Sequence, residues 1–148
     1  MANVTVTRRI DAPVQVVFRT VAQVEQFSQA VPGILRVEFL SEVKSGVGAR
    51  FRETRMMMGR EASTELEVTE YVENEHVRIV SEAGGALWDT VFTVVPDGEG
   101  TALRMVMDAQ PRSMSARMTL PLIIGTVRKA IEQDLDAVKA FCERQSRQ

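Results

Sequence analysis

Hydrophobic residues near the C-terminal end of this 148-residue chain recur with the period of an α-helix. Between Ser115 and Glu143 one apolar stripe advances in steps of three and four residues, the spacing that places side chains on one helix face. The stripe consists of Leu120, Ile124, Val127, Ile131, Leu135, Val138 and Cys142. The sequence therefore predicts one long amphipathic helix that packs against another layer.

The beginning of the chain predicts one strand followed by two short helices. Apolar and polar residues alternate over residues 4–10, as they do on a strand with one buried face. Pro13 suits the first turn of a helix, where its missing N–H removes no hydrogen bond. Helical spacing continues to Val21, and a second helix is predicted over residues 24–30.

Between Ile34 and Pro111 the hydrophobic period changes to two. Turn residues divide this stretch into six segments, in each of which apolar residues share one face. The first segment is expected to place Leu35, Val37 and Phe39 together. Buried parallel strands are apolar on both faces, so the alternation favours an antiparallel meander. One long helix beside such a meander predicts a sheet that curves around the helix and leaves a cavity between them.

One hairpin within the meander can be assigned a register. Gly59 and Arg60 are predicted to form a two-residue type II′ turn, with glycine at the first central position. This turn would place Glu53 opposite Leu66 in the neighbouring strand. The strand before the turn would then present one face that carries Ala49, Phe51, Glu53, Arg55 and Met57.

Composition and charge narrow the class of protein. The length suits one domain over residues 1–148, and 45% hydrophobic residues suffice for a core. A net charge of -2 and a pI near 5.5 argue against nucleic acid and anionic membranes as partners. No apolar run reaches the ~18–20 residues of a membrane span, so stable membrane insertion is not expected.

The single cysteine, Cys142, and the single histidine, His76, exclude several kinds of site. No intramolecular disulfide can form, and Cys/His zinc sites lack their ligands. His76 is interpreted as an exposed turn residue, and Cys142 as part of the core. The alternating N-terminal segment has no apolar signal sequence, so we expect a cytoplasmic protein without metal or cofactor.

The order of strand, two short helices, six strands and long helix resembles the helix-grip fold. The segment from Ile10 to Phe18 resembles the opening of the START-like, or SRPBCC, superfamily, in which an Ala-Pro pair starts the first helix. In that superfamily an aromatic residue follows five positions after the proline, as Phe18 does here. The segment Gly48–Glu53, the Gly59-Arg60 hairpin and Leu120-Pro121-Leu122 resemble its polyketide cyclase/dehydrase-like branch.

The resemblance implies an α+β domain in which a curved antiparallel sheet wraps around the C-terminal helix, with an internal cavity between the two. Members include lipid and steroid carriers, aromatic polyketide cyclases and ubiquinone-binding proteins, without a catalytic residue common to all. The polar cavity residues would be Glu53, Arg55, Thr64, Glu70 and Thr90. The apolar lining would be Phe51, Met57, Leu66, Val68, Trp88, Phe92, Met105, Met107, Ile124 and Val127.

The sequence allows two interpretations of the role of several residues. Met57, Met105 and Met107 line an adaptable cavity or simply fill the core. The indole N–H of Trp88 needs a partner, which Thr90 or a ligand would supply. The helix from Leu120 to Val127 would roof the cavity, where Pro121 is a kink or a first-turn residue and Gly125 allows close approach.

Glu53 and Arg55 are the candidate polar site. Their side chains leave the same face of one strand ~6.6–6.8 Å apart, so an ion pair can form between them. The pair is either self-satisfied near the cavity mouth or an anchor for a ligand. In the second case Glu53 is a candidate general acid with a raised pKa.

Three functions follow from these patterns. The first is binding of a small hydrophobic molecule, which is aromatic, polyketide-like or isoprenoid. The second is a polyketide cyclase or dehydratase, in which Glu53 transfers protons and Arg55 orients a carbonyl. The third is a homodimer through an outer face that carries Met56, Met58, Val91 and Val106, with monomer or homodimer left open.

Overall fold

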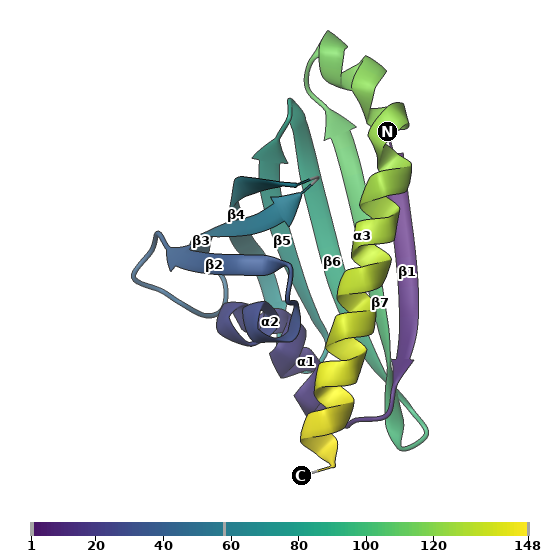
Figure 1. The fold of residues 1–148 in the computed structure, drawn as a ribbon. Helices are drawn as coiled ribbons and strands as arrows, with labels where there is room; N and C mark the ends of the chain where they lie inside the picture. The colour runs from purple at the N-terminus through teal and green to yellow at the C-terminus, as the bar shows by residue number, and fades with distance from the viewer. Residues whose placement is uncertain (1, 58, 148) are drawn as a thin grey trace.

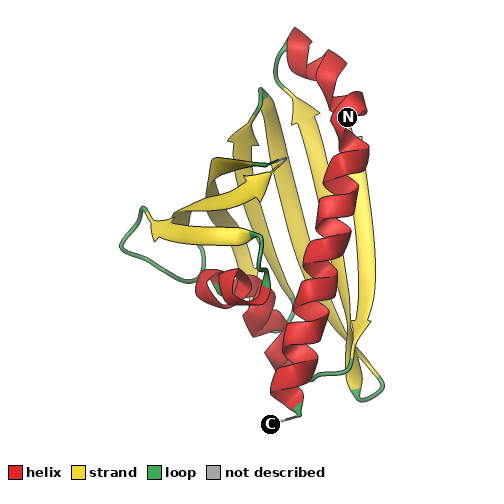
Figure 2. Ribbon diagram, viewed as in Figure 1, coloured by secondary structure: helices red, strands yellow, loops and turns green. Residues whose placement is uncertain are grey.

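The structure, a computed structural model, describes residues 2–57 and 59–147. In these residues a seven-stranded antiparallel sheet curves around one face of a long helix, with two short helices at one end (Figures 1 and 2). The elements are β1 (Ala2–Ile10), α1 (Val14–Ala22), α2 (Val24–Ala30), β2 (Ile34–Phe39), β3 (Arg50–Met57), β4 (Arg60–Val72), β5 (His76–Ala83), β6 (Ala86–Asp97), β7 (Gly100–Pro111) and α3 (Met114–Ser146).

The strand order is β1-β7-β6-β5-β4-β3-β2, so only β1 is separated in sequence from its neighbour. This arrangement confirms the predicted helix-grip fold of the α+β class. The periodicities explain its two layers, because each strand turns its apolar face toward the concave side, which α3 covers. Among residues 2–57 and 59–147, no helix has the length and apolar character needed to cross a membrane.

The β3–β4 hairpin forms with a register two residues away from the predicted one. Met57 pairs with Arg60, so Gly59 occupies the second position of the loop, where its φ of 79° suits glycine. Glu53 consequently lies opposite Thr64. A shift of two residues leaves every side chain on its predicted face, whereas a shift of one would have inverted both faces.

Two β-bulges change which side chains face inward. In β2 the register shifts between Ile34 and Arg36, and Leu35 is exposed instead of sharing a face with Val37. In β4 the register shifts between Val68 and Glu70, which turns the Glu70 side chain to the outer face. The sequence periodicity had predicted an uninterrupted alternation of inward and outward side chains through both positions.

The residues of the predicted dimer face lie in different surroundings. Met56 is exposed on β3, as predicted, whereas Met58 lies outside the described residues. Val91 and Val106 are partners across β6 and β7 and are half-buried. Oligomeric state therefore stays a prediction.

The C-terminal half of α3 forms the core against β1, α1 and the sheet. Leu135, Val138 and Cys142 are fully buried. The Cys142 thiol donates to Thr20 Oγ1 at 3.3 Å, and burial raises the pKa of this thiol. Cys142 is thus a core residue with little thiolate, as predicted.

The N-terminal part of α3 differs from its predicted role. The helix begins at Met114 after the cap Ser113, so Pro121 lies inside the helix and not in its first turn. A Cβ added to Gly125 would meet nothing within 4 Å, which removes the predicted close approach. Only the middle of α3 roofs the pocket described below, while its first turns extend past the strands (Figure 1).

The two glycines Gly100 and Gly125 give a matched test of the packing. A Cβ at Gly100 would lie 2.6 Å from the Ile10 carbonyl oxygen, so Gly100→Ala must move backbone. We expect Gly100→Ala to lower the free energy of unfolding by about 1–3 kcal/mol. Gly125→Ala, in open space on a helix, should raise it by about 0.5–1 kcal/mol. Urea unfolding of both variants measures the difference, and equal effects would contradict the close contact between β7 and β1.

Candidate ligand-binding pocket

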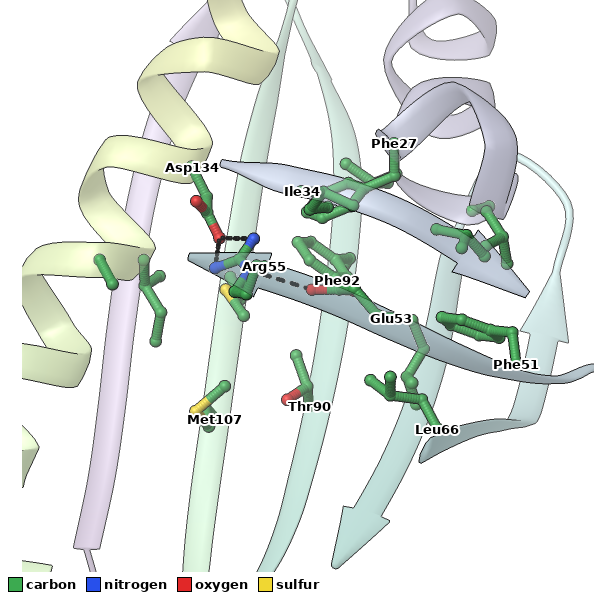
Figure 3. A pocket seen from close by; sticks show the side chains of 18 of the residues that line it. Phe27, Ile34, Phe51, Glu53, Arg55, Leu66, Thr90, Phe92, Met107 and Asp134 are labelled. Carbon is green, nitrogen blue, oxygen red and sulfur yellow. Dashed lines mark hydrogen bonds and ion pairs between the residues drawn. The ribbon is translucent and has the colours of Figure 1, made fainter. Parts of the chain in front are cut away.

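A mainly apolar pocket lies between the concave face of the sheet, the short helices and the middle of α3 (Figure 3). Its cavity volume is about 200 Å³. This is below the ~300–1,000 Å³ that small-molecule sites typically measure. Met57 lines the pocket while 42% exposed, so the pocket reaches the surface beside the end of β3.

The sheet supplies most of the lining that the sequence predicted. The even shift of the hairpin register and the regular alternation of β6 and β7 keep these side chains on the concave face. The predicted residues that line the pocket are Phe51, Glu53, Arg55, Met57, Leu66, Thr90, Phe92, Met105, Met107 and Val127.

Trp88, Ile124 and Val68 lie outside this lining. Trp88 and Ile124 pack beside Leu120 in a separate small apolar cluster at the other end of the sheet. The Trp88 indole donates to the Ala83 carbonyl oxygen at 3.0 Å, and so is satisfied by backbone and not by Thr90 or a ligand. Val68 is 1% exposed and belongs to the packed core.

The predicted polar residues Thr64 and Glu70 also lie elsewhere. Thr64 sits opposite Glu53 in β4 and shares its face of the sheet, but it does not line the pocket. Glu70 is half-exposed and accepts from Arg78 at 3.0 Å, with His76 Nε2 at 3.2 Å from its other oxygen. The bulge before Glu70 explains its position, and His76 is a strand-end residue in this outer-face network.

Three charged side chains form a cluster at the pocket wall, Glu53 and Arg55 from β3 and Asp134 from α3 (Figure 3). Both terminal nitrogens of Arg55 donate to Asp134 Oδ2, at 3.1 and 3.2 Å. Arg55 Nε lies 3.1 Å from Glu53 Oε1, an ion pair whose angle is not that of a hydrogen bond. All three side chains are less than one-fifth exposed.

Asp134 is the charged pocket residue that the sequence analysis missed. It follows Val127 and Ile131 at steps of four and three, and Val138 comes four residues later. An acidic residue at that position of an apolar helix face was the available signal. It was overlooked because Leu135, one residue further, continues the stripe equally well.

Burial sets the protonation behaviour of the cluster. Desolvation raises the pKa of Glu53, while the nearby Arg55 guanidinium opposes the shift. Desolvation likewise raises the pKa of Asp134, and the Arg55 guanidinium again opposes the shift. With two carboxyl groups and one guanidinium, the cluster holds one more potential negative charge than positive. A proton shared with either carboxyl would neutralise it and provide a hydrogen-bond donor.

The other missed lining comes from helices and from neighbouring strands. Phe27 of α2 packs edge-to-face against Phe92 with ring centroids 5.9 Å apart, which closes one wall. The sequence placed Phe27 on a helix but could not orient that helix toward the sheet. The additional lining residues are Val21, Ala22, Val24, Phe27, Ile34, Val37, Ile79, Ala130, Ile131 and Asp134.

The chemistry that this arrangement offers is apolar contact combined with one hydrogen-bonding, titratable cluster. In the part of the chain that the structure describes, no group of three or more His, Cys, Asp and Glu side chains could hold a metal ion.

Arg55→Met should destabilise the fold in a pH-dependent way. The variant leaves two desolvated carboxyl groups without their cation, which should cost about 2–3 kcal/mol of unfolding free energy near pH 8. Both carboxyls already have folded-state pKa values above the ordinary 4.5 and 3.8, and losing Arg55 raises them further. Protonation then relieves the penalty, so the loss should shrink toward about pH 5.

Chemical denaturation at several pH values measures this difference. Arg36→Met is the matched control, because Arg36 pairs with Glu61 at the exposed surface, and it should change stability by less than about 0.5 kcal/mol. A loss for Arg55→Met that is independent of pH would contradict the assigned role of the cluster.

Solved structures with low sequence identity share this fold. The Thermus thermophilus protein TTHA0849 superposes with a TM-score of 0.80 at 19% identity, over 98% of this chain and 99% of that one. A START superfamily protein from Mycobacterium smegmatis gives a TM-score of 0.71 at 17% identity, over 98% and 97% of the two chains. These likenesses establish the fold and carry no information on the ligand.

The di-domain ARO/CYC protein StfQ from the steffimycin biosynthetic pathway also matches, with a TM-score of 0.80 at 12% identity. The match covers 97% of this chain and 51% of that protein, so this chain corresponds to about half of it. No curated protein sequence matches the chain significantly.

The predicted START-like resemblance is confirmed by these structures and by a sequence profile. The profile describes polyketide cyclases, dehydrases and lipid transport proteins, and it matches residues 1–143. The chain therefore belongs to the polyketide cyclase/dehydrase and lipid transport family.

Proposed function

We propose that this protein binds one small, mainly hydrophobic molecule in the pocket between the sheet and α3. The observation that supports this proposal is an open apolar pocket whose wall contains a single buried cluster, Glu53, Arg55 and Asp134. Apolar walls with few convergent polar groups are the usual composition of such sites. Family membership supports a ligand-binding or cyclase role in the same space.

The charged cluster favours certain polar groups on the ligand. The Arg55 guanidinium already contacts carboxylates on two sides, so it is poorly available to a third anion. The cluster has two carboxyl groups and one guanidinium, and its excess negative charge would repel an anionic ligand group in a medium of low dielectric. A neutral hydroxyl or carbonyl group fits better, because a carboxyl group with a raised pKa can donate to it or accept from it.

The apolar walls suit a ring system or a branched chain. Phe27, Phe51 and Phe92 provide flat surfaces at one end, and Met57, Met105 and Met107 provide flexible ones. Aromatic, polyketide-like and isoprenoid molecules with one or two oxygen substituents share these properties.

A variant that fills the pocket tests binding. Ala130 lines the pocket from α3, whereas Ala140 lies on an exposed face of the same helix. We expect Ala130→Phe to weaken binding of a neutral solvatochromic dye, such as Nile red, at least about tenfold, because the ring occupies ligand space. Ala140→Phe should bind like the wild type. Fluorescence titration gives both affinities, and equal weakening or unsaturable binding would count against the pocket.

A second candidate function is a cyclase or dehydratase reaction in the same pocket. The raised pKa values of Glu53 and Asp134 favour it, because a carboxyl group that titrates closer to neutral pH can both donate and accept a proton. Arg55 would hold Glu53 and Asp134 in place, and would not itself orient the substrate carbonyl. This role differs from the one predicted for Arg55 by the sequence.

Turnover of a linear poly-β-ketone substrate tests this candidate. If Glu53 transfers protons, Glu53→Gln should lower the rate by about 10²–10⁴-fold. Glu65→Gln is the control, because Glu65 lies on the exposed outer face and pairs with Arg52. Equal rates for wild type and Glu53→Gln would remove Glu53 from the mechanism and leave Asp134 as the remaining acid of the cluster.

A further inference from the structure

The first turns of α3 have apolar side chains on two opposite faces. Ala116 and Leu120 are buried against the sheet, as an amphipathic helix requires. Met114, Met118 and Leu122 form a second row at steps of four residues on the opposite face, and they are 76%, 76% and 80% exposed. We call these three residues the outer stripe.

An outer stripe of this kind is unusual for a helix on a protein surface. A helix that is apolar all round is normally buried in a protein or in lipid. Here the start of α3 reaches past the strands (Figure 1), and the outer stripe faces away from the sheet, so the described residues do not cover it. The geometry therefore calls for an occupant from outside the chain.

The charged residues that flank the outer stripe in the sequence have one sign. From Arg112 to Ala130 the charged residues are Arg112, Arg117, Arg128 and Lys129, and the segment has no acidic residue. The whole chain has 18 basic and 20 acidic residues, so this segment is a local concentration of positive charge in an acidic protein. An occupant that is both apolar and negatively charged complements it.

We infer that the outer stripe docks the protein reversibly on the surface of an anionic lipid bilayer. Exposed methionine and leucine would enter the boundary between head groups and acyl chains, and the arginines would contact anionic head groups. The segment has an apolar face and basic flanks, the combination typical of helices that lie in the membrane interface. The inference concerns surface attachment and is independent of ligand binding in the pocket.

A second copy of the chain fits the same surface poorly. Two-fold pairing through the outer stripe would bring the basic residues of both copies together. Three side chains also bury far less than the ~800 Å² per partner of a typical stable interface. Attachment to a bilayer has neither problem.

Docking would also place the pocket roof near the lipid. Leu122 precedes the pocket residue Val127 by five positions, which is ~7.5 Å along the helix axis. The helix that attaches the protein would thus be the helix that covers the pocket.

Co-sedimentation of the full chain with extruded vesicles tests the inference. Wild type should bind vesicles of phosphatidylcholine with about 30% phosphatidylglycerol, and bind vesicles of phosphatidylcholine alone at least about tenfold more weakly. Raising the salt from about 0.1 M to about 0.5 M should weaken binding to the anionic vesicles.

Paired variants identify the surface. Met118→Gln/Leu122→Gln should reduce binding at least about tenfold, and Arg112→Gln/Arg117→Gln should reduce it on anionic vesicles. Val47→Gln/Val95→Gln is the matched control, because both valines are exposed and lie outside α3, and it should bind like wild type. Circular dichroism shows that each variant is folded.

Three results would overturn the inference. The first is no sedimentation of wild type with either kind of vesicle. The second is binding that the outer-stripe variant leaves unchanged. The third is a wild-type dimer in light scattering that Met118→Gln/Leu122→Gln converts to monomer, since the outer stripe would then be an interface between copies.

Discussion

The structure depends on the packing of α3 against the concave face of the sheet. Leu135 and Val138 are completely buried there, and they anchor the C-terminal half of the helix. Because the sheet curves away from α3, contact is close at one end and looser in the middle. The same helix therefore belongs to a packed core, to a pocket roof and, at its start, to an exposed surface.

The charged cluster shows how a mainly apolar pocket accommodates charged side chains. Arg55 joins β3 to α3 through Asp134, and it also neutralises Glu53 beside it. Isolated charges would be costly in so apolar a space, and Arg55 lowers that cost by pairing with both carboxyl groups. The cluster thus links the two layers physically and concentrates the polar chemistry of the pocket at one point of its wall.

The net charge of the whole chain gave no indication of the outer stripe and the basic residues around it in the sequence. A net charge of -2 argued against anionic partners, yet every charge from Arg112 to Ala130 is positive. The outer stripe of Met114, Met118 and Leu122 was equally hidden, because apolar residues at helical spacing are normally assigned to the core. Only the packing of one helix face against the sheet distinguishes the buried row from the exposed row.

The sequence by itself determined the elements, their order and the faces of most strands. Periods of two and of 3.6 arise from local backbone geometry, and even the misplaced hairpin turn kept Glu53 and Arg55 on the inner face. Tertiary structure decided the bulge that turned Glu70 outward and the approach of Asp134 to Arg55. These features depend on contacts between segments distant in the chain, about which local periodicity carries no information.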